Sequence, residues 1–334
     1  MDDAYLPFVI GHRGASGYRP EHSAAAYSLA LRLGVHAVEP DLVATKDGVV
    51  VIRHENEIGG TTDVADHPEF AHRRTQKVID GVRYTGWFVE DFTWEELSTL
   101  RTRERMPRLR PNSASFDGEQ PILRLRDLMA ALETHDGEAG VMHGLVAELK
   151  HPTYHASIGI DLVGLVHAEL ARWSGRVGLT VECFEQSALT GMRERGLEAR
   201  YVYLLEAHGS APDQKARLGR AALPYSAQLT APGLDRLSRE VDGVSVDKSM
   251  LLEDDGRGGV RINDLVERVQ DAGLVAFAWT LRPENHFLHP AHRIGTSPET
   301  WGQWRREYEL ILSSRIDGVF ADHPDLVFEA LGIL

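Results

Sequence analysis

The sequence predicts an α/β fold in which eight parallel strands and their crossover helices close into a (β/α)8 TIM barrel. Short apolar runs alternate with helical patterns from one end of the 334-residue chain to the other, and this alternation is typical of a parallel sheet with crossover helices. Eight such runs can be counted, and barrels of this length commonly form one domain. An open, doubly wound sheet is the alternative that the pattern leaves open.

Strands and helices follow one another in a regular order. Each predicted strand is a short apolar run, and each predicted helix carries apolar residues at the spacing of one helical face. The strands are predicted at Phe8–His12, Ala37–Val43, Leu145–Leu149, Leu179–Phe184, Ala199–Leu204, Gly243–Val246, Val275–Thr280 and Gly318–Asp322. The clearest helices are predicted at Glu21–Leu33, Ile158–Trp173 and Asp264–Ala272.

A hairpin is predicted directly after the second strand. Asp47-Gly48 is a strong two-residue turn because both of its positions tolerate a positive φ. Such a turn pairs Lys46 with Val49 and, counting back, places Asp41 opposite His54. Directly paired residues share a face of the hairpin, so these two side chains are expected to converge.

Residues 55–120 interrupt the alternation of strands and helices. They are rich in Pro, Arg, His and Asp and have little periodicity, so we expect an insertion that caps the barrel. The arginines of LRTRERMPRLR, residues 100–110, are expected to form an exposed face of this insertion. No linker or repeat divides the chain, which predicts a single domain over residues 1–334.

Composition excludes several classes of protein. A formal net charge of −14 argues against a non-specific nucleic-acid binder, because phosphate backbones are held by basic surfaces. No run approaches the roughly 20 apolar residues of a membrane helix, so no stable membrane insertion is expected. The single cysteine, Cys183, permits no internal disulfide. The start, MDDAYLPFVIGHRG, lacks signal-peptide features, which predicts a cytoplasmic protein unless a leader was removed.

Acidic residues stand near the ends of two predicted strands. Glu39 and Asp41 are two residues apart on one strand, so their side chains share a face, and Glu148 stands two residues before Lys150 at the end of another. Apolar surroundings make an uncompensated carboxylate costly, and hard cations such as Ca²⁺ or Mg²⁺ prefer oxygen ligands. His54 beside them suits acid/base chemistry. The alternatives are a solvated hairpin edge and a surface pair of Glu148 with Lys150.

The first strand runs into a glycine-rich bend, FVIGHRGASG, at residues 8–17. Its three glycines allow a sharp bend with room for a ligand, while Arg13 offers a planar fork to phosphate oxygens. The spacing G-x-x-G-x-x-G does not fit a dinucleotide fingerprint. Ser16 lacks the following glycine of a serine-hydrolase elbow. Trp279, in FAWTLRP, is expected to wall an apolar part of the substrate pocket.

Several segments together resemble the glycerophosphodiester phosphodiesterase family, and they cover most of the chain in order. They are HRGASGYRPEHS, GVHAVEPDLVATKDGVVVIRHE, AELKHPTYH, ECFEQSAL, VDGVSVDKSML, FAWTLRPEN and DGVFADHPD. The long segment after His54 resembles the insertion typical of that family. The resemblance implies a barrel hydrolase that cleaves deacylated phospholipids to glycerol 3-phosphate and an alcohol with the help of one divalent metal ion.

The resemblance also implies roles for the residues that match the family's motifs. These are His12 and His54 as the acid/base pair, Glu39, Asp41 and Glu148 as metal ligands, and Arg13 and Lys150 as phosphate contacts. Two positions depart from the family pattern: Pro-Glu-His-Ser stands at residues 20–23 in place of Pro-Glu-Asn-Thr, and Glu55 follows His54 in place of Asp. The first departure changes the hydrogen bonding expected behind the first strand.

This reading gives a mechanism with some choices left open. A divalent cation, Arg13 and Lys150 would neutralise the phosphodiester, while one histidine takes a proton from the attacking hydroxyl and the other protonates the leaving alkoxide. The attacker is water or the glycerol's own neighbouring hydroxyl. The preferred headgroup, the metal bound in the cell and the oligomeric state stay open. The sequence also does not decide which histidine is the acid and which is the base. The alternatives are a phospholipase acting on intact lipids and a non-catalytic binder of glycerophosphodiesters.

Overall fold

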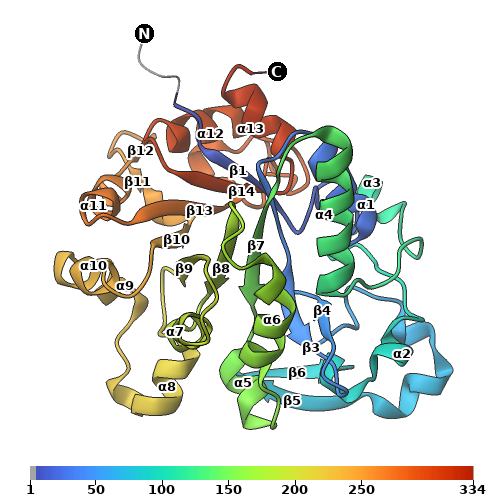
Figure 1. Ribbon diagram of the computed structural model, residues 1–334. Coiled ribbons are helices and arrows are strands. Elements are labelled where there is room, and N and C mark those ends of the chain that lie inside the picture. The colour runs from blue at the N-terminus through green and yellow to red at the C-terminus, as the bar shows by residue number, and fades with distance from the viewer. Residues whose placement is uncertain (1–4, 334) are drawn as a thin grey trace.

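A computed structural model describes residues 5–333 and has eight parallel strands closed into a barrel with helices around it (Figure 1). Closure is visible at β1 (Phe8–His12), which pairs on one side with β14 (Gly318–Ala321) and on the other with β2 (Ala37–Glu39). The first and last strands of the chain are therefore neighbours. The predicted (β/α)8 barrel is confirmed, and the open sheet is excluded.

All eight predicted strands are present, with ends that differ by at most two residues. Pro40, which lacks an N–H, separates β2 from β3 (Asp41–Ala44), and the two segments together form the second barrel strand. The other barrel strands are β7 (Gly144–Leu149), β8 (Leu179–Cys183), β9 (Arg200–Leu205), β10 (Gly243–Asp247) and β13 (Val275–Leu281).

The three predicted helices are also present, and each is shorter than predicted. The helix expected at 158–173 begins only at Leu162, because Asp161 accepts a hydrogen bond from the N–H of Gly164 and caps α6 (Leu162–Leu170). The remaining helices are α1 (Ala24–Arg32), α4 (Leu125–Ala139), α5 (Pro152–Ser157), α7 (Gln186–Glu194), α8 (Pro212–Leu218), α9 (Tyr225–Gln228), α10 (Ala231–Leu237), α11 (Leu265–Asp271), α12 (Trp304–Leu312) and α13 (Pro324–Ala330). Within residues 5–333, none of the helices is long and apolar enough to span a membrane.

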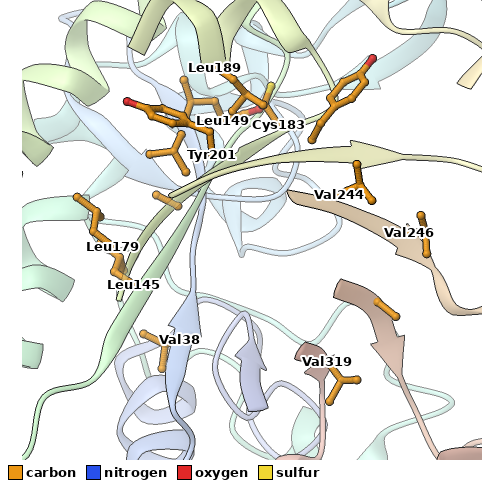
Figure 2. Close-up of a cluster of buried hydrophobic side chains, with 14 of the residues drawn as sticks. Val38, Leu145, Leu149, Leu179, Cys183, Leu189, Tyr201, Val244, Val246 and Val319 are labelled. Atoms are coloured by element: carbon orange, nitrogen blue, oxygen red, sulfur yellow. The ribbon is translucent and has the colours of Figure 1, made fainter. Parts of the chain in front are cut away.

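Alternation along the barrel strands separates two apolar layers. Outward-facing residues pack against the helices, and Figure 2 shows part of this layer, with Leu189 of α7 in one cluster with Leu149 of β7 and Cys183 of β8. Inward-facing residues fill the barrel interior as a smaller plug. The plug consists of Ile10, Ala37, Val146, Val202, Phe277 and Phe320. Because the side-chain period of a strand is two, the next inward-facing layer lies two residues further along each strand.

The hairpin after the second barrel strand has a register that differs from the prediction by one residue. Leu42 pairs with Ile52 across β3 and β4 (Val50–Ile52), and the N–H of Thr45 donates to the carbonyl of Val49 at 3.0 Å. The loop therefore has three residues and ends in Gly48, whose φ of 77° is left-handed, as is usual for a three-residue hairpin loop. The predicted pairing of Lys46 with Val49, and of Asp41 with His54, is wrong.

Arg53 takes the place predicted for His54 across the hairpin. Its N–H donates to the carbonyl of Asp41 at 3.0 Å. His54 follows one residue later, beyond the end of β4, and still lines the mouth of the barrel. The histidine therefore reaches the expected place through the loop rather than through strand pairing.

Residues 55–120 pack beside the β3–β4 hairpin around a core of their own (Figure 1). The segment contains the hairpin of β5 (Thr75–Ile79) and β6 (Val82–Gly86) and two short helices, α2 (Trp94–Leu97) and α3 (Pro111–Ala114). Its apolar residues, including Ile58, Phe70, Val89 and Phe92, contact Val43 and Val51 of the hairpin.

The expectation of an exposed arginine face on this segment is wrong for two of its arginines. The Arg110 side chain is only 4% exposed, and the Arg105 side chain is partly buried. Both point inward because they are paired with carboxylates of the barrel mouth. Arg108 between them is exposed.

Candidate active site

Polar side chains form a layer directly beyond the apolar plug, at the carboxyl ends of the strands. His12 lies beside Glu39 in the β1–β2 register, and Glu148 lies between Asp41 and Glu182 in the registers of β7 with β3 and β8. All five residues are buried, with at most 9% of their surface exposed. His12, His54, Glu148, Lys150, Glu182 and Trp279 are among the residues that line a cavity of ≈160 Å³ at this level. Carboxyl ends of barrel strands are where such enzymes place their catalytic groups.

The glycines of the first loop make room for this chain rather than for a ligand, which corrects the expectation from the sequence. Gly14 has a φ of 87°, and a Cβ at this position would lie 2.6 Å from the backbone of α1 at Ala26. A Cβ at Gly17 would lie 2.0 Å from the ring of His323. The tight turn directs the N–H of Arg13 toward Glu39, whose Oε2 accepts it at 2.9 Å.

Several buried carboxylate oxygens in the polar layer lack a hydrogen-bond partner. Oε1 of Glu39, Oδ1 of Asp41 and Oε2 of Glu182 are buried and have no hydrogen-bond partner. Ligand atoms of Glu39, Glu148 and Glu182 lie within 4.8 Å of one another. That spacing is within twice the Ca²⁺–oxygen distance of about 2.3–2.6 Å, and an all-oxygen donor set suits a hard cation. The residues present therefore fit a divalent cation.

Asp41 lies next to this group of ligand atoms but is engaged by three cationic or polar side chains. Its Oδ2 is 2.9 Å from Nε2 of His22 and 3.2 Å from Nε of Arg13, and its Oδ1 is 3.6 Å from Nζ of Lys150. Nδ1 of His22 is 2.8 Å from the hydroxyl of Tyr27. His22, which stands where the family pattern has Asn, thus fixes Asp41 against α1.

The expected alternatives of a solvated edge and a surface pair are both excluded by burial. Glu39 and Asp41 are each 1% exposed. Glu148 does pair with Lys150 at 2.7 Å between Oε1 and Nζ, but the pair lies inside the mouth of the barrel.

Charge crowding shifts the pKa of each carboxyl in the layer. Burial raises the pKa of Glu148 to about 8 even though Lys150 opposes the shift, and burial together with neighbouring carboxylates raises the pKa of Glu39 and Glu182 well above the ordinary range. Burial alone would also raise the pKa of Asp41, but Lys150 and other neighbouring cationic groups hold it well below its ordinary value. In the absence of a cation, this layer keeps protons on several of its carboxyls.

Each histidine of the predicted acid/base pair is held by a carboxylate through Nδ1. Nδ1 of His12 is 2.6 Å from Oδ1 of Asp322, and Nδ1 of His54 is 2.5 Å from Oε1 of Glu55. In the neutral ring this bond places the proton on Nδ1 and leaves Nε2 as the basic nitrogen. Burial, reinforced by Arg13, lowers the pKa of both rings, to about 4 for His12. In the protein without substrate or cation, these shifts favour the neutral form of both rings at pH 7.

Lys150 and Trp279 both line the small cavity, and the ring of Phe184 lies near both of them. Nζ of Lys150 is 5.5 Å from the centre of the Phe184 ring, which packs edge-on against Trp279 at 5.7 Å. The two aromatic rings line both the small cavity and an adjoining cavity of ≈510 Å³ that opens beside the β5–β6 hairpin. Trp279 thus lies on the apolar wall of the pocket.

Several residues that contribute to this site were not predicted from the sequence. Glu182 could have been found, because L-T-V-E-C alternates along β8 and puts Glu182 on the same face as Thr180, toward the interior. Asp322 directly follows β14, in the same position at the strand end as other site residues. His22 and the two insertion arginines carried no local signal, since their partners lie far away along the chain.

A sequence profile of the glycerophosphoryl diester phosphodiesterase family matches residues 12–326, a range that begins at His12 and includes every residue of the polar layer. The chain belongs to the glycerophosphoryl diester phosphodiesterase family. It is therefore an enzyme, a phosphoric diester hydrolase.

Curated relatives and solved structures agree with this family. The chain is 26% identical over 343 residues to a glycerophosphodiester phosphodiesterase of Arabidopsis thaliana, covering 95% of this chain and 83% of the relative. It is 28% identical over 304 residues to one of Treponema pallidum, covering 83% and 81%. A phosphodiesterase of Oleispira antarctica, solved in complex with the product sn-glycerol-3-phosphate, has the same fold, with a TM-score of 0.62, 20% identity and 98% of each chain covered.

Removing divalent cations is expected to make stability fall more steeply as pH rises from 7 to 8. Without a cation, Glu148 has a pKa of about 8 in the folded protein against an ordinary value of 4.5, so over this range the folded protein binds more protons than the unfolded chain. The free energy of unfolding then falls with pH, by at most about 1.4 kcal/mol per pH unit for each such carboxyl. The histidine rings contribute little here, because their pKa values lie below 7 in both states.

Thermal unfolding midpoints in EDTA and in saturating Ca²⁺ or Mg²⁺ measure this difference. Burial raises the pKa of Glu185, outside the layer, to about 8 as well, and its contribution appears under both conditions. The unfolding midpoint should therefore fall more steeply with pH in EDTA than in Ca²⁺ or Mg²⁺, and the difference between the two slopes reports on the cation site. Equal slopes under the two conditions would contradict the placement of a cation among these carboxylates.

Proposed function

We propose that this enzyme hydrolyses glycerophosphodiesters to glycerol 3-phosphate and an alcohol, with one divalent cation, Ca²⁺ or Mg²⁺, and two histidines as the acid/base pair. The observation that carries the proposal is the cavity itself: His12 at the end of β1 and His54 in the loop after β4 line one small space together with Glu148, Glu182 and Lys150. Family membership and the product-bound Oleispira antarctica neighbour support the same reaction.

The cation would be held by Glu39, Asp41 and Glu148, with Glu182 as a further carboxylate. The buried oxygens of Glu39, Asp41 and Glu182 that have no hydrogen-bond partner support this assignment, because each would otherwise lose its hydration without compensation. Glu148 is included because its ligand atom lies within 4.8 Å of those of Glu39 and Glu182. When bound, a divalent cation offsets the charge of the phosphodiester and polarises the phosphoryl group.

Arg13 and Lys150 would complete the neutralisation of the phosphate. Both line the small cavity, and both are already held by carboxylates, Arg13 by Glu21 and Lys150 by Glu148. Cations that are fixed before the substrate arrives stabilise the developing charge without reorganising during the reaction.

The two histidines would divide the proton transfers between them. With Nδ1 bonded to a carboxylate, the Nε2 of one neutral ring accepts the proton of the attacking hydroxyl as the new P–O bond forms. The other ring would have to take up a proton when the anionic substrate binds, because both rings favour the neutral form in the free protein. It then gives that proton to the alkoxide as the P–O bond to the alcohol breaks. Water or the neighbouring glycerol hydroxyl can serve as attacker, and in the second case water opens the cyclic product.

The pocket suits a small diester. The cavity of ≈160 Å³ contains the acid/base and cationic groups, and the adjoining one of ≈510 Å³ offers space for the departing alcohol. The substrate is accordingly a soluble small molecule with a phosphodiester at the junction of the two cavities.

Purified protein is expected to release glycerol 3-phosphate from glycerophosphodiesters, and only with Ca²⁺ or Mg²⁺ present. A panel of choline, ethanolamine and glycerol diesters, assayed with and without EDTA, checks both parts. Activity that survives exhaustive chelation would contradict the role of the cation. Silence across the panel with either metal would contradict the substrate class.

His12→Ala and His54→Ala are each expected to lower kcat by about 10² to 10⁴-fold while the affinity for substrate changes little, since each variant loses one proton transfer. The variant that lacks the general acid should regain part of this loss on a nitrophenyl ester, whose leaving group needs no proton. If neither variant responds to the leaving group while both retain substrate affinity, the histidines only position the substrate.

Glu182→Gln is expected to weaken Ca²⁺ and Mg²⁺ binding by about 10-fold or more, because the amide keeps the shape of the side chain but loses its charge. Isothermal titration of the metal-free protein measures this directly. Glu104→Gln is the matched control, since Glu104 is also buried but is bonded to Ser113, away from the polar layer. Equal metal affinity in wild type and Glu182→Gln would remove Glu182 from the site.

A further inference from the structure

Two arginines of the 55–120 insertion enter the barrel mouth from the loop between two short helices. Arg105 and Arg110 lie between α2 and α3, in the stretch that was expected to be an exposed basic face. Their guanidinium groups do not line the small cavity. Each one instead contacts a carboxylate that in turn contacts a histidine.

Arg110 is held on three sides. Its Nε donates to Oε1 of Glu284 at 2.7 Å, its Nη2 donates to Oδ2 of Asp322 at 2.7 Å, and its Nη1 donates to the carbonyl of Ser16 at 3.3 Å. Asp322 uses its other oxygen, Oδ1, for Nδ1 of His12. The chain of contacts therefore runs from the insertion through Asp322 to the first histidine.

Arg105 makes an equivalent chain to the second histidine. It binds Glu55 with two nitrogens, at 2.7 Å and 2.6 Å, and Glu21 with two, at 2.8 Å and 2.6 Å. Oε1 of Glu55 is bonded to Nδ1 of His54, and Oε2 of Glu21 accepts from Nη1 of Arg13 at 3.0 Å. The guanidinium of Arg105 therefore contacts the carboxylate that holds the His54 ring and the carboxylate that holds Arg13, the proposed phosphate ligand.

These contacts matter because the carboxylates that hold the rings lie in loops. Asp322 follows the end of β14 and Glu55 follows the end of β4, so no strand pairing fixes their side chains. A carboxylate bonded only to an imidazole can rotate about its own axis. A second partner on the same group, above all a planar guanidinium, fixes the plane of the carboxylate and with it the ring.

We propose that Arg105 and Arg110 are positioning residues, each of which holds one histidine in its working orientation through a shared carboxylate. The inference rests on the roles proposed above for His12 and His54. It makes the insertion a working part of the active site: one short segment aligns both halves of the acid/base machinery.

The two arginines are not equivalent. Asp322 also accepts from Nε of Arg282 at 2.7 Å, so one cation stays on this carboxylate when Arg110 is lost. Among the residues that the structure describes, Arg105 is the arginine that bonds Glu55. Arg105→Met is therefore expected to lower kcat by about 100-fold and Arg110→Met by about 10-fold, the range typical of partners that orient catalytic groups.

Arg108→Met is the matched control. Arg108 lies on the same segment and is exposed, so its loss removes the same charge from the insertion without touching the site. It should keep the wild-type kcat and KM. If kcat in Arg105→Met and Arg110→Met also stays at wild type, the proposal fails.

Double-mutant cycles separate positioning from a general structural effect. Arg110→Met should lower kcat in the wild-type background but add nothing in His12→Ala, while Arg105→Met should add nothing in His54→Ala, because the ring to be positioned is gone. The crossed pairs, Arg110→Met with His54→Ala and Arg105→Met with His12→Ala, should each lose more than either single variant. Equal losses in all backgrounds would show a structural role and overturn the proposal.

Two further readouts keep the outcome unambiguous. If Arg105→Met or Arg110→Met does not fold, the corresponding Lys variant, Arg105→Lys or Arg110→Lys, is used in its place in the cycles, because lysine keeps a cation near the carboxylate. If His12→Ala and His54→Ala themselves leave kcat unchanged, the proposed function fails instead. That result is distinct from a failure of the arginines alone, in which the histidine variants lose activity and the arginine variants do not.

Discussion

The arrangement of the whole mouth of the barrel depends on one constraint: four carboxylates are buried together on top of an apolar plug. Glu39, Asp41, Glu148 and Glu182 occupy neighbouring strands one layer above that plug, where unpaired negative charges are strongly disfavoured. Lys150 and Arg13 contact only part of this set. A divalent cation is the simplest group that compensates the remainder, and a phosphate ester can then approach a site whose charge is already balanced.

Outside this group of carboxylates, basic and acidic side chains alternate from the barrel mouth toward the insertion. Arg13 bonds Glu21, Glu21 bonds Arg105, and Arg105 bonds Glu55, so that acidic and basic groups follow one another from the barrel axis to the insertion. Such a network is costly to bury unless nearly every donor and acceptor is satisfied. The histidines are the points where this network meets the cavity. Their orientation is therefore set by carboxylates and arginines that do not line the small cavity.

Much of the fold followed from local pattern, and the failures have a common physical cause. The eight strands and the inward placement of Glu39 and Glu148 follow from a period of two, which neighbouring residues alone determine. The hairpin register was wrong because Asp47-Gly48 fits a two-residue or a three-residue loop, and the choice rests on the hydrogen bond that the N–H of Thr45 donates to the carbonyl of Val49. Arg105 and Arg110 were misplaced because their partners lie far from them along the chain, where periodicity carries no information.

The two departures from the family pattern show how such networks tolerate substitution. His22 replaces an Asn and is long enough to bond Asp41 with one ring nitrogen and Tyr27 with the other. Glu55 replaces an Asp and can bond the His54 ring while both its oxygens face Arg105. In both cases a longer side chain still reaches its partner, Asp41 for His22 and Arg105 for Glu55. The site therefore requires contact with that partner rather than one particular residue type. A substituted residue that still reaches the same partner preserves the geometry of the site. For Glu55 that partner is Arg105, so the insertion that supplies Arg105 takes part in holding His54.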